Sequence, residues 1–388
     1  MSRAIVSYVS ELIQATSAGV AYNWKKNDGK QKMKLGIIGL PQSGKTTVFN
    51  ALTRAEQPTG EAVSRMEVHS AVVDVPDERV ERLTHMFNPK KKILAKVTYA
   101  DIAGLGSAAD KGEISGQLLN QLAQMDGYIH VVRCFDDPQV AHVRERIDPQ
   151  RDIRLMDEEF MLNDQIMVER KQEKLTEEHR KGGGRDKGLI EREIALFERL
   201  HAALASGQPL RELDLNSEKE KAISGFGFLS RKPLMILLNL GEGQAESQLD
   251  DLPAKAGCLA LQGKLEMDIV RLPDEDAQVF MAEYGISELG LVRLIRASYD
   301  LLGLQSFFTV GEDEVRAWTV RRGALAPEAA GVVHSDMEKG FIRAEVVAYS
   351  DLMTCGSLAE ARARGKLRLE GKQYPVQDGD VISVRFTS

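Results

Sequence analysis

One glycine-rich segment constrains the fold of this chain more than any other. Residues 39–46 (GLPQSGKT) match the pattern G-x-x-x-x-G-K-[ST], directly after the apolar run 35–38 (LGII) and before residues 47–52 (TVFNAL). Strand, tight loop and helix in this order form a phosphate-binding loop, whose backbone N–H groups and helix N-terminus face the phosphates of a nucleotide. The segment therefore predicts an α/β fold with the sheet of a P-loop nucleoside triphosphatase. The residues expected to bind the nucleotide here are Pro41, Gln42, Ser43, Gly44, Lys45, Thr46 and Thr47.

A magnesium site is expected beside this loop. Lys45 is the first catalytic candidate, because its ammonium would neutralise charge on the β- and γ-phosphates, and the hydroxyl of Thr46 would ligate Mg²⁺. The strand expected at residues 95–100 ends in Asp101, which opens a D-x-x-G pattern that closes at Gly104. Ligands of open α/β sheets bind at the carboxyl ends of the strands. Asp101 is therefore expected to hold the metal, and the backbone N–H of Gly104 to meet the γ-phosphate.

Composition limits the other possibilities. A formal net charge of −7 over 388 residues argues against a protein that coats nucleic acid uniformly. Three scattered cysteines without metal-ligand spacing are typical of reduced thiols in a cytoplasmic protein. No apolar stretch approaches the about 18 residues of a membrane span, so no contact with a membrane is expected. The length suits two or three domains.

The first 32 residues form a separate extension. Polar residues interrupt its apolar stretch at residues 6–20, so the core of a signal peptide is not present. We expect a disordered or loosely helical segment, with a docking helix as the alternative. Two later polar segments, residues 57–66 and 106–117, are expected to be the switch loops that respond to the γ-phosphate.

The apolar pattern after the phosphate loop predicts alternating strands and helices. Strands are expected at residues 71–75, 95–100, 127–135, 233–238 and 258–261, and helices at residues 77–87 and 289–302. Residues 90–92 (KKK) are expected to be a solvated edge, or otherwise part of a surface that faces a polyanion. His130 lies within a buried strand and is expected to be a satisfied core residue. His142 follows that strand in a loop at the catalytic edge of the sheet, which makes it the second catalytic candidate.

Residues 152–223 are expected to form an antiparallel helical hairpin. Two charged stretches with apolar residues at helical spacing flank residues 182–184 (GGG). The expected tip is basic although the chain is acidic, and it is either simply solvated or in contact with RNA or a ribosome-sized partner. The basic residues are His179, Arg180, Lys181, Arg185 and Lys187.

The segment expected to recognise the base departs from the usual pattern. GTPases carry Asn-Lys-x-Asp after the corresponding strand, whereas this chain has Asn239, Leu240 and then Glu242. In GTPases the carboxylate of this motif accepts two N–H groups of guanine. Losing such a two-bond contact lowers the discrimination between bases by about 1–3 kcal/mol, by analogy with base readout elsewhere. Strict guanine specificity is therefore not expected. Residues 262–266 (QGKLE) are expected to be the second base-contacting loop, which places Gly263 at the nucleotide.

The last part of the chain reads as a small β-rich module. Short strands are expected at residues 305–310, 314–320, 341–347 and 381–386, separated by turns such as residues 378–380 (DGD). The pattern resembles a β-grasp module without catalytic groups.

These motifs together resemble the YchF/Obg-like ATPases of the translation-factor-related P-loop class. The most specific ones are residues 294–302 (LIRASYDLL), 315–319 (VRAWT) and 338–344 (EKGFIRA). The resemblance implies an OBG-type P-loop domain at 33–150 and 230–304, a helical coiled-coil insertion at 151–229 and a TGS domain at 305–388. Gln42 and Ser43 stand where the family usually has Asn and Val.

The resemblance also implies an activity. The family binds ATP as well as or better than GTP and associates with ribosomes, here through the hairpin tip and the TGS domain, and with the large subunit as the expected partner. His142 falls on a loop histidine proposed to assist hydrolysis. Leu105 falls where many GTPases carry a glutamine that orients water, so unassisted turnover is expected to be slow, on the order of 10⁻⁴ to 10⁻³ s⁻¹.

We therefore expect a slow, Mg²⁺-dependent ATPase that accepts GTP less selectively and works as a nucleotide switch. One alternative is a nucleotide-gated RNA- or ribosome-binding module with negligible hydrolysis. Another is a strict GTPase.

Overall fold

The computed structural model describes residues 33–55, 57, 68–102, 115–138, 140, 142, 146–182, 184–245, 249 and 252–387. The N-terminal extension, most of the first expected switch loop and residues 106–114 of the second lie outside the described residues, as do Gly104 and Leu105. Contacts between residues divide the chain into two compact units. The first contains residues 34–70 and 99–291, and the second contains residues 71–98 and 292–388.

A six-stranded sheet with the order β2-β4-β1-β5-β6-β7 carries the phosphate loop. Strands β1, β5, β6 and β7 are parallel, with Ile38 of β1 opposite His130 of β5. Every residue of β5 and β6 is buried, which fits parallel strands covered on both faces. The arrangement confirms the predicted α/β fold. The strands are β1 (Lys34–Ile38), β2 (His69–Asp74), β4 (Lys96–Asp101), β5 (Gly127–Arg133), β6 (Leu234–Asn239) and β7 (Gly257–Leu261).

Several helices accompany this sheet. They are α2 (Lys45–Thr53), α5 (Gly116–Ala123), α9 (Gly263–Arg271) and α10 (Asp274–Glu283); α11 (Gly290–Leu301) begins at the end of the first unit, and most of its residues belong to the second. The expected loop at residues 262–266 is wrong, because α9 begins at Gly263. Glu266 explains the difference: its buried carboxylate accepts the backbone N–H groups of Gly290 at 2.5 Å and Leu291 at 2.9 Å, at the start of α11. Glu266, in the segment expected to be a loop, is thus a buried residue that caps the start of α11.

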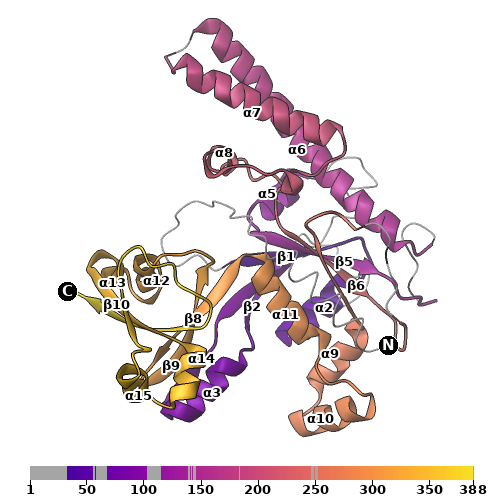
Figure 1. Cartoon of the computed structure of the whole chain (residues 1–388). Helices are drawn as coiled ribbons and strands as arrows, with labels where there is room; N and C mark the ends of the chain where they lie inside the picture. The colour runs from indigo at the N-terminus through magenta and orange to yellow at the C-terminus, as the bar shows by residue number, and fades with distance from the viewer. Residues whose placement is uncertain are drawn as a thin grey trace. The chain divides into compact units, whose positions relative to one another are not determined.

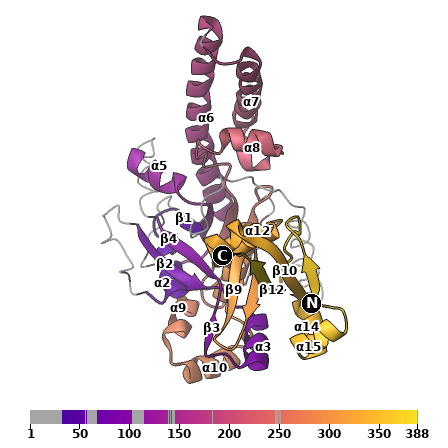
Figure 2. The same cartoon turned by 90° about the vertical axis from the view of Figure 1, so that its left-hand side faces the viewer.

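The helical hairpin consists of α6 (Pro149–Lys181) and α7 (Lys187–Ala205), which lie side by side in Figures 1 and 2. Asp148 caps the first turn of α6, and Gly182 ends it in the left-handed conformation, as helix-stop glycines do. Apolar residues of both helices share one core, which includes Val168, Leu175 and Phe197. The predicted pair of helices around the glycine run is confirmed. A short 3₁₀ helix (Leu210–Glu212) and α8 (Ser217–Ile223) follow.

Buried polar contacts fix the base of the hairpin. Asp164 of α6 is fully buried and accepts the backbone N–H groups of Leu229 at 2.8 Å and Ser230 at 2.7 Å, and the Ser230 hydroxyl at 2.6 Å. Burial raises the pKa of Asp164 to about 7 against the effect of these hydrogen bonds. Arg211, also buried, forms an ion pair with Asp157 of the same helix. These contacts attach α6 to the segment that leads into β6.

The second unit contains another six-stranded sheet, with the order β11-β10-β12-β8-β9-β3. Its strands are β3 (Lys91–Ile93), β8 (Leu304–Val310), β9 (Glu314–Arg321), β10 (Phe341–Ala348), β11 (Arg368–Glu370) and β12 (Asp380–Phe386). Its helices are α3 (Glu78–Phe87), α12 (Ala326–Val333), α13 (Ser335–Lys339), α14 (Tyr349–Cys355) and α15 (Leu358–Ala363). The four C-terminal strands expected from the sequence are thereby confirmed.

Residues 71–98 belong to this second unit although they lie between the phosphate loop and Asp101 in the sequence. Strand β3 pairs in parallel with β9, with Lys92 opposite Val315. The lysines at residues 90–92 are exposed, as a solvated edge requires, but two of them also form ion pairs with acidic side chains. A strand at this point was not expected, because a lysine run gives no sign of its partner.

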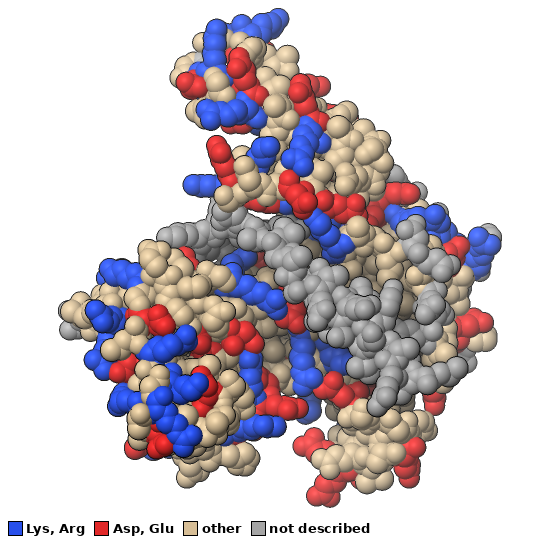
Figure 3. All heavy atoms as spheres, viewed as in Figure 1, with Lys and Arg blue, Asp and Glu red and all other residues tan. Residues whose placement is uncertain are grey.

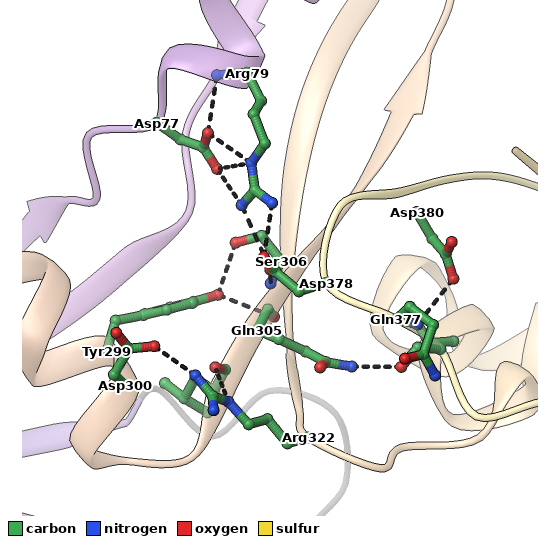
Figure 4. A network of polar contacts seen from close by, with 12 residues as sticks. Asp77, Arg79, Tyr299, Asp300, Gln305, Ser306, Arg322, Gln377, Asp378 and Asp380 are labelled. Atoms are coloured by element: carbon green, nitrogen blue, oxygen red, sulfur yellow. Dashed lines mark hydrogen bonds and ion pairs between the residues drawn. The ribbon is translucent and has the colours of Figure 1, made fainter. Parts of the chain in front are cut away.

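A polar network ties α3 to the C-terminal sequence (Figure 4). Arg79 bonds Asp77, the N-cap of α3, and its Nη1 lies 2.7 Å from Asp378 Oδ2. Asp378 in turn accepts the backbone N–H of Ser306 at 3.0 Å. The guanidinium also lies 5.0 Å from the centre of the Phe308 ring. Helix α3 is therefore part of the C-terminal packing.

Within the described ranges, no helix is long and apolar enough to cross a membrane.

Candidate functional site

The phosphate loop connects β1 to α2 in the conformation that its glycines permit. Gly39 and Gly44 have φ values of +148° and +94°. A β-carbon at Gly39 would lie 2.4 Å from the carbonyl oxygen of Val131, and one at Gly44 would lie 2.2 Å from Nδ2 of Asn239. Gln42, with φ of +60°, adopts the left-handed conformation without being a glycine. Only glycine fits the first two positions, which confirms the structural reason for the pattern.

The groups expected to meet phosphate and metal lie together. The Thr46 hydroxyl donates to Oδ2 of Asp101 at 2.9 Å, and Lys45 Nζ donates to the Leu40 carbonyl at 2.7 Å. Burial lowers the pKa of Lys45 to about 8, with Asp101 opposing the shift. Burial also raises the pKa of Asp101, against the Thr46 hydrogen bond and the charges of Lys45 and His69. A lysine and an aspartate held in a desolvated site are suited to a charged ligand.

These residues fit a magnesium ion. The second carboxylate oxygen of Asp101, Oδ1, is buried and has no hydrogen-bond partner among the described residues. Mg²⁺ prefers oxygen ligands and is usually bound through one or two protein groups, with water and phosphate oxygens completing its shell. A hydroxyl and a carboxylate oxygen at the end of β4 supply this kind of donor set. In the described part of the chain, no cluster of three or more His, Cys, Asp or Glu side chains offers a different metal site.

Asn239 joins three segments of the site. Its Nδ2 donates to the Ser43 carbonyl at 3.0 Å, and its Oδ1 accepts the backbone N–H of Gly263 at 3.0 Å. The side chain therefore bonds the phosphate loop and the start of α9 while lying at the end of β6. Leu240 is buried, and Glu242 is exposed in the following turn. The structure thus brings Asn239 and Gly263 to the phosphate loop, and leaves Glu242 accessible from solvent.

His142 pairs with an acidic residue that the sequence did not single out. Its Nε2 lies 3.1 Å from Oδ2 of Asp152, and the two side chains are 5% and 4% exposed. The other oxygen of Asp152 accepts two hydrogen bonds from the Arg151 guanidinium, at 2.9 and 2.8 Å. His142 and Asp152 line one small hollow with the phosphate-loop residues Leu40 and Pro41. The predicted loop histidine therefore lies against the phosphate loop.

His130 also lines this hollow, together with Ser43. It is buried as expected, but neither ring nitrogen has a hydrogen-bond partner within the described residues. Burial, with Lys45 and Arg211 as nearby positive charges, lowers the pKa of His130 to about 3. The expectation of a satisfied core histidine is thus wrong in one respect, because the ring is a neutral group that makes no hydrogen bond to any residue that the structure describes.

Asp152 is the functional candidate that sequence reasoning missed. It lies in the first turn of α6, at the start of a long charged stretch where one carboxylate looks like the others. Its position ten residues after His142 in the sequence gives no sign of a contact. Only the tertiary structure shows that the two side chains meet.

The hairpin end is the other charged feature of the first unit (Figure 3). Lys and Arg side chains gather there, with acidic side chains among them. Lys181 pairs with Glu177 at 2.5 Å, and Arg185 pairs with Glu178 at 3.2 Å and with Glu193. Part of the expected basic charge is thus neutralised locally.

Comparisons with known proteins cover both units. A family model described as a 50S ribosome-binding GTPase matches residues 34–171. The model of the YchF-GTPase C-terminal domain, described as a protein of unknown function, matches residues 304–387.

Relatives match over nearly the whole chain. The ribosome-binding ATPase YchF of Bacillus subtilis (strain 168) is 40% identical over 363 residues, which cover 90% of this chain and 98% of that protein. The ribosome-binding ATPase YchF of Escherichia coli O157:H7 is 39% identical over 362 residues, with 91% and 99% covered. The structure of the Schizosaccharomyces pombe YchF GTPase aligns with a TM-score of 0.78 at 28% identity and covers 93% of this chain and 99% of that one. The resemblance read from the sequence motifs is confirmed, and the chain belongs to the YchF family.

Proposed function

We propose that this chain is a Mg²⁺-dependent nucleoside triphosphatase that acts as a slow nucleotide switch. The observation that carries the proposal is the pair formed by the Thr46 hydroxyl and the Asp101 carboxylate, 2.9 Å apart beside Lys45 in the phosphate loop. A hydroxyl, a carboxylate and an ammonium on a glycine-rich turn are the protein groups that phosphoryl transfer uses in P-loop enzymes. ATP is the proposed substrate, and GTP is accepted less selectively.

The residues of this chain divide the work of hydrolysis. Lys45 exchanges its contact with the Leu40 carbonyl for phosphate oxygens, which carry more negative charge. Thr46 and Asp101 would hold Mg²⁺, which would supply positive charge to the phosphate oxygens. The backbone N–H groups of residues 42–47 surround the phosphates. His142 is the proposed group that assists attack by water.

The base is held more loosely than the phosphates. Asn239 is committed to the Ser43 carbonyl and the Gly263 N–H, so it shapes the site rather than reading the base. Leu240 is buried, which leaves Glu242 as the exposed acid of this segment. An acid on an accessible turn, one methylene longer than the usual aspartate, supports loose discrimination between adenine and guanine.

The ribosome is the proposed partner. The two curated relatives are named ribosome-binding ATPases, and the family model that covers the phosphate loop is described by 50S ribosome binding. We assign the contacts to the hairpin tip and the C-terminal TGS domain, and the partner surface to the large subunit. A ribosomal partner supports the further proposal that the protein is cytoplasmic. The domain boundaries that accompany it are the nucleoside triphosphatase domain at 33–150 and 230–304, the insertion at 151–229 and the TGS domain at 305–388.

A nucleotide titration tests this proposal. Fluorescent ATP, ADP, GTP and GDP are titrated with and without Mg²⁺ into the full chain and into the Lys45→Ala variant. We expect tighter binding of the triphosphates with Mg²⁺, less than a tenfold difference between ATP and GTP, and a large loss in the variant. Failure to bind any purine triphosphate at millimolar concentration would overturn the proposal.

Adding ribosomes separates the remaining possibilities. A switch should show faster turnover when ribosomes are present. Nucleotide-dependent association without stimulated turnover would instead identify a binding module, and a large preference for GTP would identify a strict GTPase.

A further inference from the structure

The structure assigns Asp152 as a positioning residue for His142, so that the first turn of the hairpin helix α6 sets the orientation of the histidine at the phosphate loop. The inference rests on the proposed function, because it concerns how His142 is presented to the reaction. It goes further by naming the group that holds the histidine and the element that carries this group.

The contact between the two side chains is directional. An ionised carboxylate can only accept hydrogen bonds, so the ring nitrogen facing it, Nε2, carries the proton. The lone pair of the neutral ring then lies on Nδ1. A carboxylate that fixes the tautomer and angle of an imidazole is a common arrangement around histidines that take part in proton transfer.

The carboxylate itself is held firmly. Oδ1 of Asp152 accepts from both Nε and Nη2 of Arg151, which leaves Oδ2 for His142. The residue also lies in the first turn of α6, where the partial positive charge of the helix N-terminus stabilises an acid. Its side chain is 4% exposed, so water competes little for the contact. Rotation of the ring away from this geometry therefore requires breaking a buried, charge-assisted hydrogen bond.

The pair is placed where it can matter for hydrolysis. His142 and Asp152 line the same hollow as Leu40, Pro41 and Ser43 of the phosphate loop. Far from the phosphate loop, the same contact between a histidine and an acid would only stabilise the fold. Here both residues contact the space beside the loop that binds the nucleotide.

The same helix reaches the far end of the hairpin. Helix α6 runs for 33 residues without interruption from Pro149 to Lys181 (Figure 1), which corresponds to about 50 Å. Asp152 lies in its first turn, and three of the basic residues of the tip, His179, Arg180 and Lys181, lie in its last. A partner that shifts or rotates this helix therefore moves the group that orients His142. Movement of the hairpin would in this way change the orientation of His142 and so the rate of hydrolysis.

A mutant cycle tests the assignment. ATP turnover and nucleotide affinity are measured for Asp152→Asn, His142→Ala and the double variant, with and without ribosomes. We expect kcat of Asp152→Asn to fall by roughly tenfold or more, because an amide also stabilises the wrong tautomer, while KM and affinity change by less than about twofold. The double variant should be no slower than His142→Ala, since Asp152 acts only through the histidine. Asp152→Glu should restore part of the rate.

The control variant is Asp148→Asn. Asp148 caps the same helix by accepting the backbone N–H of Arg151 at 3.1 Å. We expect this variant to keep the wild-type kcat although it weakens the helix start. Equal losses of kcat in Asp148→Asn and Asp152→Asn would show that only helix stability matters, and would overturn the assignment. A double variant that is slower than His142→Ala by the full factor of Asp152→Asn would also overturn it.

A spectroscopic measurement separates this inference from the proposed function. Long-range proton–nitrogen correlation spectra of the chain labelled with ¹⁵N-histidine report the tautomer of each ring, and the spectrum of His142→Ala identifies the signal. We expect the Nε2–H tautomer in the wild type and a shifted signal in Asp152→Asn. A wild-type chain that hydrolyses ATP no faster than Lys45→Ala would overturn the proposed function. An unchanged His142 signal in Asp152→Asn would overturn the positioning role whatever the rate.

Discussion

Replacing Asn239 by alanine should loosen the phosphate loop without changing any group that touches phosphate. The Asn239 amide holds the Ser43 carbonyl and the Gly263 N–H, each at 3.0 Å. Ser43 is 2% exposed and Gly263 is also buried, so water has little access to either group in the folded site. The substitution therefore leaves two buried polar groups without their partner.

The expected size of the effect follows from these two contacts. A buried donor or acceptor that loses its hydrogen bond costs about 1–3 kcal/mol. Two such groups give roughly 2–4 kcal/mol once partial relaxation of the loop is allowed for. Because the loop must hold this conformation to bind phosphate, the same free energy corresponds to a loss of affinity between about 30-fold and 1,000-fold.

Fluorescence titration with a labelled ATP analogue measures this loss, and thermal unfolding of the nucleotide-free chain reports the change in stability. The matched control is Asn163→Ala, since Asn163 Nδ2 makes a single hydrogen bond to the Glu159 carbonyl within α6, at 2.8 Å. The control should bind nucleotide within about twofold of the wild type. If Asn239→Ala also binds within threefold while remaining folded, the bridging role assigned to the amide is wrong.

Three further predictions test other parts of the structure. Gly44→Ala should abolish tight nucleotide binding, because φ is +94° and the added carbon meets Asn239, whereas Gly182→Ala, with φ of +66° and open space around it, should bind normally; equal affinities would contradict this reading. Arg79→Ala should lower the free energy of unfolding by about 1–2 kcal/mol, against less than about 1 kcal/mol for Arg322→Ala at an exposed ion pair, as measured by urea titration; an inverted order would refute it. Burial raises the pKa of Asp164 to about 7, above the roughly 4 of an unfolded chain, so the folded state binds the extra proton and its stability falls as pH rises between these values. The stability difference between the wild type and Asp164→Asn should therefore shrink from about pH 5 to about pH 7, and a constant difference would show that Asp164 does not titrate in this range.

The phosphate loop can be predicted from the sequence because its determinants are local. The left-handed conformations of Gly39 and Gly44, the apolar strand before them and the helix after them are all encoded within about 20 residues of chain. The helices of the hairpin are local in the same sense, since residue spacing and a glycine run define them. Placing Asp101 beside the phosphate loop required one further argument, because the two are far apart in the sequence. The carboxyl ends of parallel strands lie at a common edge of the sheet, where ligands bind.

The contacts that determine how the site works are not local. His142 could be placed at the catalytic edge from its position in the chain, but its bond to Asp152 could not be predicted from the sequence. Asn239 was expected at the base, and its amide instead holds two backbone segments. Glu266 shows the same limit, because an acid that caps α11 from within α9 has the local pattern of a surface residue. Residue type and spacing give the location of a group, whereas its partner depends on the tertiary structure.

The grouping of residues 71–98 with the C-terminal sequence has a consequence for how the chain folds. Strand β3 pairs with β9, with Lys92 opposite Val315. The hydrogen bonds of β3 can therefore form only when the C-terminal strand β9 is present. Val80 and Leu83 of α3 are fully buried, and α3 packs on β8 and β9.

A fragment that ends at residue 304 would therefore expose the apolar face of α3, although it contains every residue proposed to bind nucleotide. We expect such a fragment to bind a hydrophobic dye and to be cleaved by protease within residues 71–98, and to fold less cooperatively than the full chain. A fragment that resists proteolysis there would show that this segment packs without the C-terminal strands. Strand β4 begins within this segment and ends at Asp101, the residue proposed to hold Mg²⁺.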